Sequence, residues 1–143
     1  MNLNKDGLDL IKNFEGCKLT VYADGAGLPT VGYGHMDRTM TIGNTIDQEE
    51  ANTLLDVDLT RTENVLRKYI KVIITDNQFS ALVSLAFNIG VGNFVKSTLL
   101  KLVNEEEFDD AAKEFMKWDH LGQDLSVGLM RRREAEKALF LKA

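Results

Sequence analysis

The sequence has few of the features that characterise disulfide-rich, membrane-spanning or exported proteins. Its 143 residues include one cysteine, Cys17, and one proline, Pro29. A single cysteine cannot form an intramolecular disulfide, which excludes a disulfide-stabilised scaffold and fits synthesis in a reducing compartment. No apolar run reaches the roughly 20 residues that cross a bilayer. Residues 1–6 are polar and lack the apolar core of a signal peptide, so we expect synthesis in the cytoplasm without an export segment.

Basic residues are in the minority. Seventeen Lys and Arg stand against twenty-two Asp and Glu, which gives a net charge of −5. Binding to nucleic acid regardless of its sequence needs a basic surface, so we expect no nucleic-acid partner. Only two histidines occur, His35 and His120, and no Cys/His spacing matches a metal site. We therefore expect no metal and no cofactor in a single globular domain of ordinary composition.

Glycine is concentrated in one window of the chain. Six of the eleven glycines lie between residues 16 and 43, together with Pro29. Because glycine and proline favour turns, this window is expected to hold turns and short strands. Residues 19–23 and 30–35 have β-favouring patterns and are separated by the turn signal Asp24-Gly25. We predict a small twisted hairpin or a three-stranded sheet here.

Outside this window, apolar residues recur at helical spacing. We predict a helix over residues 3–15 that Gly16 ends, a long helix to about Tyr69, and a very apolar helix that Gly90 closes. Two capping boxes, Thr45 with Gln48 and Thr75 with Gln78, are predicted to start the second and third helices. Shorter helices are predicted over 97–103, 108–118 and 130–141.

These elements predict a mostly helical α+β fold. We expect a β-containing lobe at about 16–46, a connecting helix at about 47–69, and a helical lobe at about 75–143. The first helix is expected to pack on the helical lobe, because its apolar stripe needs more apolar surface than a small sheet offers.

Two carboxylates lie where a helix end and a sheet edge are predicted to face each other. Eight residues separate Glu15 from Asp24, and five separate Asp24 from Thr30. Glycoside hydrolysis needs one protonated and one ionised carboxyl group. The negative end of the helix favours the protonated form of Glu15, whereas water and backbone N–H groups favour an ionised Asp24. A water held by Thr30 would imply an inverting reaction, with the carboxyls about 6.5–9.5 Å apart.

The spacing alone leaves this chemistry open, because a solvated helix end and an ordinary Asp-Gly turn give the same pattern. However, the Glu-x8-Asp-x5-Thr pattern resembles the catalytic signature of the phage lysozymes, glycoside hydrolase family 24. The likeness includes Phe14, directly before the pattern, and residues 30–35, which begin with its last residue. Residues 87–90, 93–99 and 131–140 resemble later segments of that family in the same order. The resemblance covers the whole chain and implies a lysozyme-like, two-lobed single domain.

The resemblance also implies roles for individual residues. Glu15 would be the proton donor, Asp24 the base that activates water, and Thr30 the residue that positions the water. Three further residues match positions that contact the saccharide in the family, although core packing is an alternative for the second: Met36, Phe87 and Ser97.

The arginine run and the first histidine have two readings each. Arg131, Arg132 and Arg133 fit an exposed basic turn of helix, but the resemblance implies that one of them reaches the cleft. We predict that this arginine contacts Glu15, where its charge would oppose the effect of the helix end. On its own chemistry His35 fits a catalytic base or a metal ligand, whereas the resemblance implies a structural residue with a hydrogen-bond partner.

The implied function is hydrolysis of the β-1,4 bond between N-acetylmuramic acid and N-acetylglucosamine in peptidoglycan glycan strands. The enzyme would be a monomer made in the host cytoplasm, and it would reach periplasmic peptidoglycan after a separate holin opens the membrane. Three alternatives remain: a lytic transglycosylase, which yields a 1,6-anhydro product; an antibacterial muramidase effector; and a glycan-binding module without catalysis, which would keep its effect in Glu15→Gln.

Overall fold

The computed structural model describes residues 1–143 and divides them into two compact units. The helical unit comprises Met1–Leu10 and Thr62–Ala143, and the sheet unit comprises Ile11–Arg61. Helices α1 (Lys5–Glu15) and α2 (Gln48–Tyr69) each have residues in both units. The predicted mostly helical α+β class with a small antiparallel sheet is confirmed. The division into a lobe, a connecting helix and a second lobe stays a prediction.

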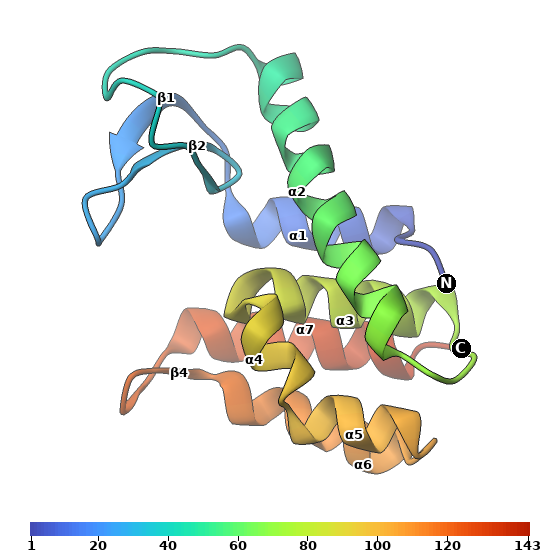
Figure 1. Ribbon diagram of the computed structural model, residues 1–143. Coiled ribbons are helices and arrows are strands. Elements are labelled where there is room, and N and C mark those ends of the chain that lie inside the picture. Colours follow the sequence, from blue (N-terminus) through green and yellow to red (C-terminus); the bar gives the residue numbers. More distant parts are fainter. The chain divides into compact units, whose positions relative to one another are not determined.

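The sheet unit contains three antiparallel strands in the order β1-β2-β3 (Figure 1). They are β1 (Lys18–Ala23), β2 (Pro29–Gly32) and β3 (His35–Met36). The predicted strand over 19–23 is confirmed, and of the two predicted arrangements the three-stranded sheet is correct, because residues 30–35 contribute to two strands and not to one. Gly34 has a φ of 83°, a conformation that glycine adopts without strain. The chain therefore turns at Tyr33-Gly34 and separates β2 from β3.

Helix α1 begins and ends at residues with suitable capping chemistry. The Asn4 side chain accepts a hydrogen bond from the Gly7 N–H at 2.9 Å, which satisfies a donor that has no partner within the helix. At the other end, the Gly16 N–H donates to the Lys12 carbonyl at 3.0 Å, and Gly16 has a φ of 67°. The predicted end of this helix at Glu15-Gly16 is confirmed.

Helix α2 ends at Tyr69 as predicted, but its predicted capping box at Thr45 is wrong. Asp47 lies directly before the helix and accepts a hydrogen bond from the Glu50 N–H at 2.8 Å. Thr45 instead forms an isolated β-bridge with Thr20. An N-cap residue must directly precede the first helical residue, and Thr45 is too early in the chain to do so.

The helical unit is built around α3 (Asp76–Ile89), which has α7 (Val127–Leu141) packed along it (Figure 1). The predicted capping box is confirmed, because Thr75 accepts from the Gln78 N–H and Gln78 accepts from the Thr75 N–H. Gly90, with a φ of 93°, ends the helix as predicted. Buried apolar side chains of this unit include Phe79, Leu82, Leu85, Phe94, Leu99, Phe115 and Phe140.

Shorter elements complete the helical unit. They are α4 (Val91–Val95), α5 (Thr98–Asn104), α6 (Phe108–Glu114) and a 3-10 helix, η1 (Phe115–Trp118). The predicted helix over 108–118 is thus an α-helix followed by a 3-10 turn, and the last helix begins three residues before its predicted start at 130. None of the helices combines the length and apolar composition that a bilayer crossing requires.

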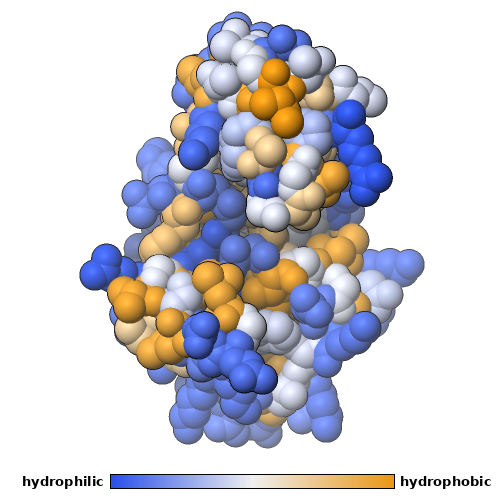
Figure 2. Space-filling view, turned by 90° about the vertical axis from the view of Figure 1, so that its left-hand side faces the viewer, coloured by the Kyte–Doolittle hydropathy of each residue, from blue (hydrophilic) through white to orange (hydrophobic).

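A hairpin that the sequence pattern did not predict precedes α7. Its strands are β4 (His120–Leu121) and β5 (Asp124–Leu125), joined by a turn in which Gly122 has a φ of 61°. Leu121 and Leu125 are exposed, and hydrophobic side chains are visible on this face of the helical unit (Figure 2). Strands of two residues with exposed leucines have no buried face, so no alternating pattern is present to predict them.

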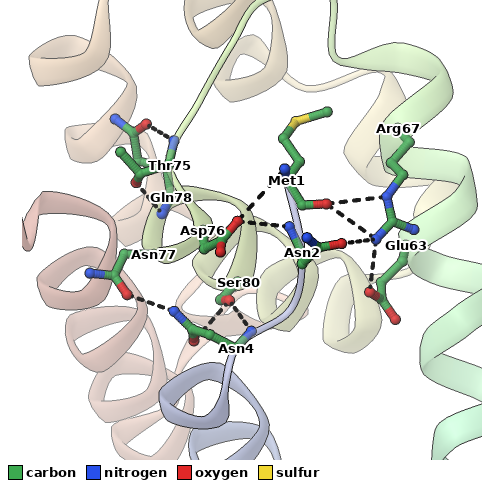
Figure 3. Close-up of polar contacts among 10 residues, drawn as sticks. All are labelled: Met1, Asn2, Asn4, Glu63, Arg67, Thr75, Asp76, Asn77, Gln78 and Ser80. Atoms are coloured by element: carbon green, nitrogen blue, oxygen red, sulfur yellow. Dashed lines mark hydrogen bonds and ion pairs between the residues drawn. The ribbon is translucent and has the colours of Figure 1, made fainter.

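The N-terminal residues of the helical unit are fixed by polar contacts to α3 and α2 (Figure 3). Asn4 bonds to Ser80 through both its backbone N–H and its side chain, at 3.0 Å each, and to Asn77 at 2.7 Å. Arg67 donates two hydrogen bonds to the Met1 carbonyl. Gly7 allows α1 to approach α3 closely, because a Cβ at this position would overlap with the Ser80 side chain.

Three charged side chains are buried where α7 faces α3: Arg132, Arg133 and Glu136. The Glu136 carboxylate lies 2.8 Å from Arg133 Nε, accepts from Arg132 Nε at 3.2 Å, and accepts from the Ser84 hydroxyl. Burial raises the pKa of the Glu136 carboxyl above its usual range, and the guanidinium groups of Arg133 and Arg132 oppose that rise. The interior of the helical unit therefore contains a compact ionic network.

Candidate active site

Glu15 is the last residue of α1, where its half-buried carboxyl group lies beside the turn between β2 and β3. A Cβ placed on Gly34 would lie 3.4 Å from Glu15 Oε1, so the missing side chain lets the turn come close to the carboxyl group. One helical turn earlier, the Lys12 ammonium group lies 5.7 Å from the centre of the Tyr33 ring. The same β2–β3 turn thus contacts two residues of α1.

Asp24 directly follows β1 and organises the loop to β2. Its Oδ1 accepts hydrogen bonds from the backbone N–H groups of Ala26 and Leu28, each at 2.9 Å. Its own backbone N–H and C=O bond to Leu28 and Gly27, at 3.0 and 2.9 Å. The Ala26 and Leu28 donors hold the carboxyl group of Asp24 in one orientation. They contact only Oδ1, which leaves Oδ2 for another partner.

Thr30 lies on β2, opposite Tyr22 of β1 and Met36 of β3. Its side chain is buried, and its hydroxyl donates a hydrogen bond to the Leu28 carbonyl at 3.0 Å. A hydroxyl group has one hydrogen to donate and two lone pairs that accept. With its hydrogen used, Thr30 Oγ1 can act towards a further partner only as an acceptor.

Helix α2 is joined to the sheet by side-chain contacts. His35 Nδ1 lies 2.8 Å from Asp58 Oδ2, which confirms the prediction that His35 has a hydrogen-bond partner. Gln48 donates to the Tyr33 hydroxyl at 3.1 Å. Both contacts hold residues next to Gly34, so they also fix the turn that lies beside the Glu15 carboxyl group.

The three predicted saccharide contacts lie in different surroundings. Met36, on β3, is 58% exposed, whereas Phe87 is half-buried near the end of α3. Ser97 is the N-cap of α5, and its hydroxyl donates to the Phe94 carbonyl at 2.6 Å and accepts from the Leu100 N–H at 3.1 Å. The structure therefore gives Ser97 a clear structural role, and its contact with saccharide stays a prediction.

A cavity of about 150 Å³ adjoins the start of α5. It is lined by Thr98, Leu99, Glu114, Lys117 and Trp118. The buried Glu114 carboxylate pairs with the Lys117 ammonium group. An aromatic ring beside hydrogen-bonding groups is a common lining for a ligand, and Ser97 directly precedes Thr98 in this lining.

The predicted arginine run divides between the surface and the interior. Arg131 is exposed, whereas Arg132 and Arg133 are buried, so an exposed basic turn is wrong for two of the three. Contact of one arginine with Glu15 stays a prediction. The structure brings together no group of three His, Cys, Asp or Glu side chains that would hold a metal ion.

Comparison with known proteins agrees with the motifs in the sequence. The profile of the phage lysozyme family matches residues 12–136. The chain is 44% identical to an endolysin of Acyrthosiphon pisum secondary endosymbiont phage 1, over the full length of both chains. It is also 37% identical to the endolysin of Salmonella phage P22, covering 99% of each chain.

Solved structures show the same likeness. The muramidase domain of SpmX from Asticaccaulis excentricus matches with a TM-score of 0.92 and 35% identity, covering 99% of both chains. A mutant of P22 lysozyme matches with a TM-score of 0.89 and 36% identity, also over 99% of both chains. From the motifs, the fold and these matches together, the chain belongs to the phage lysozyme family and is a glycoside hydrolase of the lysozyme type.

Proposed function

We propose that the enzyme hydrolyses the β-1,4 bond between N-acetylmuramic acid and N-acetylglucosamine of peptidoglycan with inversion at the anomeric carbon. Glu15 donates a proton to the leaving glycosidic oxygen. Asp24 accepts a proton from a water molecule, whose oxygen attacks the anomeric carbon from the opposite face. The products are a new reducing end of inverted configuration and a free hydroxyl group on the departing sugar.

The observation that carries this proposal is the hydrogen bonding of Asp24. Two backbone N–H groups bind Oδ1 at 2.9 Å each and fix the orientation of the carboxyl group, and a general base needs such fixed geometry. Oδ2 stays available for a water molecule. A base held by the backbone in this way does not depend on a flexible side chain for its orientation, which suits a group that must remain ionised opposite a protonated acid.

Thr30 supports an inverting reaction through the direction of its hydrogen bond. Its hydroxyl hydrogen is directed to the Leu28 carbonyl, so Oγ1 accepts a hydrogen from the attacking water. If the same water gives its other hydrogen to Asp24, both of its hydrogens are bound and a lone pair is free for the anomeric carbon. In a retaining enzyme the second carboxylate attacks the sugar directly, and no such water is held at that step.

Phe87 is proposed to contact the saccharide through its backbone. Gly90 stops α3, so the last carbonyl groups of the helix have no helical partner. The Ala86 carbonyl accepts from the Gly90 N–H, and the Ile89 carbonyl accepts from the Asn93 side chain. The Phe87 carbonyl thus remains an acceptor for a sugar N–H group. Met36 and Ser97 are proposed as further contacts.

Mass analysis of the products from purified sacculi tests the bond and both carboxyl roles. Wild type should release fragments with a free reducing end at N-acetylmuramic acid, while Glu15→Gln and Asp24→Asn should each be about 10²–10⁴-fold slower. Asp37→Asn is the matched control, because Asp37 also accepts a backbone N–H in an exposed loop but has no proposed role. Products with a 1,6-anhydro ring would identify a transglycosylase instead.

The stereochemistry needs a separate measurement. NMR of a soluble oligosaccharide substrate, recorded before mutarotation, should show the α-anomer as the first product from a β-linkage. The β-anomer would contradict the inverting mechanism. Full lytic effect in Glu15→Gln would contradict catalysis altogether and favour a glycan-binding module.

We further propose that the enzyme acts in host-cell lysis, as the relatives named endolysins suggest. It would accumulate as a monomer in the host cytoplasm and reach peptidoglycan once a holin opens the membrane. Expression in a Gram-negative host should leave the cells intact until the inner membrane is permeabilised, and turbidity should then fall. Lysis without permeabilisation would contradict the need for a holin. Light scattering of the purified enzyme checks the monomeric state.

A further inference from the structure

The end of α3 presents an exposed amide that is held in one orientation by a buried guanidinium group. Asn88 is exposed, whereas the Arg133 side chain is fully buried. Arg133 Nη2 donates a hydrogen bond to Asn88 Oδ1 at 2.6 Å. Because a guanidinium group can only donate, the amide oxygen must face it. The two hydrogens of Asn88 Nδ2 therefore point away from Arg133.

The guanidinium group that sets this orientation is itself fixed. Arg133 Nε lies 2.8 Å from Glu136 Oε1, and Glu136 also binds Arg132 and the Ser84 hydroxyl. Ser84 belongs to the same helix as Asn88, whereas the charged residues belong to α7. The network therefore joins the two helices from inside the unit. An exposed asparagine usually rotates freely, and this one does not.

The surroundings of Asn88 fit one kind of chemical group. Asn88 Nδ2 is a directed donor, and the carbonyl of the preceding residue, Phe87, is an acceptor without a helical partner. An acetamido group offers a C=O acceptor and an N–H donor. The two groups at the end of α3 complement it, and N-acetylated sugars carry an acetamido group on each ring of the proposed substrate.

We propose that Asn88 is a specificity-determining residue that donates a hydrogen bond from Nδ2 to the acetamido carbonyl of a bound N-acetylated sugar, with Arg133 as its positioning residue. This inference rests on the proposed function. Neither sequence pattern nor residue type suggested it, because the orientation of the amide depends on a buried partner 45 residues away in the sequence.

Asn88→Asp separates this role from a structural one. The carboxylate keeps the size of the amide and its contact with Arg133, but it replaces the outward donor with an acceptor. We expect KM for N-acetylated glycan to rise about 10-fold, which corresponds to about 1.4 kcal/mol, with kcat little changed and Tm unchanged or higher. A purely structural Asn88 would leave KM unaltered, because the ion pair with Arg133 is retained.

A second variant and a second substrate sharpen the test. Asn93→Ala removes the cap on the Ile89 carbonyl and should lower Tm without raising KM, so it controls for a disturbed helix end. Wild type should prefer N-acetylated over chemically de-N-acetylated glycan, and Asn88→Asp should lose about 10-fold of that preference. Unchanged KM and unchanged preference in Asn88→Asp would overturn the inference.

Binding measurements distinguish failure of this inference from failure of the proposed function. Calorimetric titration with soluble N-acetylated oligosaccharide should show about 10-fold weaker binding for Asn88→Asp. A wild type that cleaves sacculi, with Asn88→Asp binding equally well, overturns only the role of Asn88. A wild type that binds in an Asn88-dependent manner without cleaving overturns only the proposed hydrolysis. A wild type that neither binds nor cleaves overturns both.

Discussion

Asp24 in the sheet unit and Glu136 in the helical unit are both bound by several donors, but in different surroundings. Asp24 is half-buried, and backbone N–H groups bind one of its oxygens. Glu136 is fully buried; its Oε2 accepts hydrogen bonds from Ser84 and Arg132, and its Oε1 forms an ion pair with Arg133. An available oxygen suits proton transfer, whereas a fully bound carboxylate suits cohesion of the interior. The position of the donors thus separates a residue proposed for chemistry from one that supports the fold.

The largest expected effect on stability is at Glu136. Glu136→Gln should lower the free energy of unfolding by about 3–5 kcal/mol, because the glutamine NH₂ group would face guanidinium groups that need an acceptor. Asp24→Asn should change it by less than about 1 kcal/mol, since an amide oxygen can still accept both backbone hydrogen bonds. Urea unfolding followed by circular dichroism measures both. Equal losses would contradict the comparison.

The next prediction concerns one glycine in each unit that lets neighbouring segments of the chain come close together. A Cβ on Gly7 would lie 2.9 Å from the Leu3 side chain and overlap with Ser80, so Gly7→Ala should cost about 1–3 kcal/mol of stability. Gly34→Ala, at a φ of 83°, should cost about 1–2 kcal/mol. Only Gly34→Ala should also reduce kcat, because it disturbs the surroundings of Glu15. Thermal unfolding and turnover on sacculi give the two readouts.

Helix caps give a smaller effect. Thr75→Ala and Asp47→Ala should each lower the free energy of unfolding by about 1 kcal/mol, because each removes an N-cap hydrogen bond. Thr45→Ala should cost less, since the Thr45 side chain caps no helix. Chemical unfolding of the three variants tests this order, and a larger loss at Thr45 than at Asp47 would contradict the assignment of the α2 cap.

The pH dependence of Glu136 sharpens the comparison further. Burial raises the pKa of this carboxyl above 4.5, so the folded protein binds its proton more tightly than the unfolded chain does. The contribution of Glu136 to the free energy of unfolding is therefore fully present below pH 4.5, and it declines as pH rises through the raised pKa. The difference in unfolding free energy between wild type and Glu136→Gln should shrink from pH 4.5 towards neutrality. A difference that grows with pH would contradict this.

The periodic parts of the fold were predictable from sequence, and the non-periodic parts were not. Helical spacing and a terminal glycine predicted α1 and α3, because burial of one face imposes the pattern on the sequence. The β4–β5 hairpin has no buried face and left no such pattern. At Thr45 the capping-box spacing was present, but Asp47 lies directly before the helix and takes the role.

The roles of the candidate site residues stay predictions, whereas the structure adds contacts that the sequence did not indicate. The positions of Glu15, Asp24 and Thr30 followed from spacing and family resemblance, and the backbone donors at Asp24 agree with the expectation for that turn. The burial of Arg132 and Arg133 was missed, because charged residues are usually exposed. Their spacing to Glu136 by three and four residues is the signal in the sequence that indicates an ionic network on one helix face.

The way Asp24 is bound has a consequence for how this loop can evolve. Its two donors are main-chain atoms of Ala26 and Leu28, and every amino acid except proline supplies them. Side chains at these two positions can therefore vary among members of the family, while the geometry of the Asp24 carboxyl group stays unchanged. Natural diversity in the loop should be wide in side chains and closed to proline.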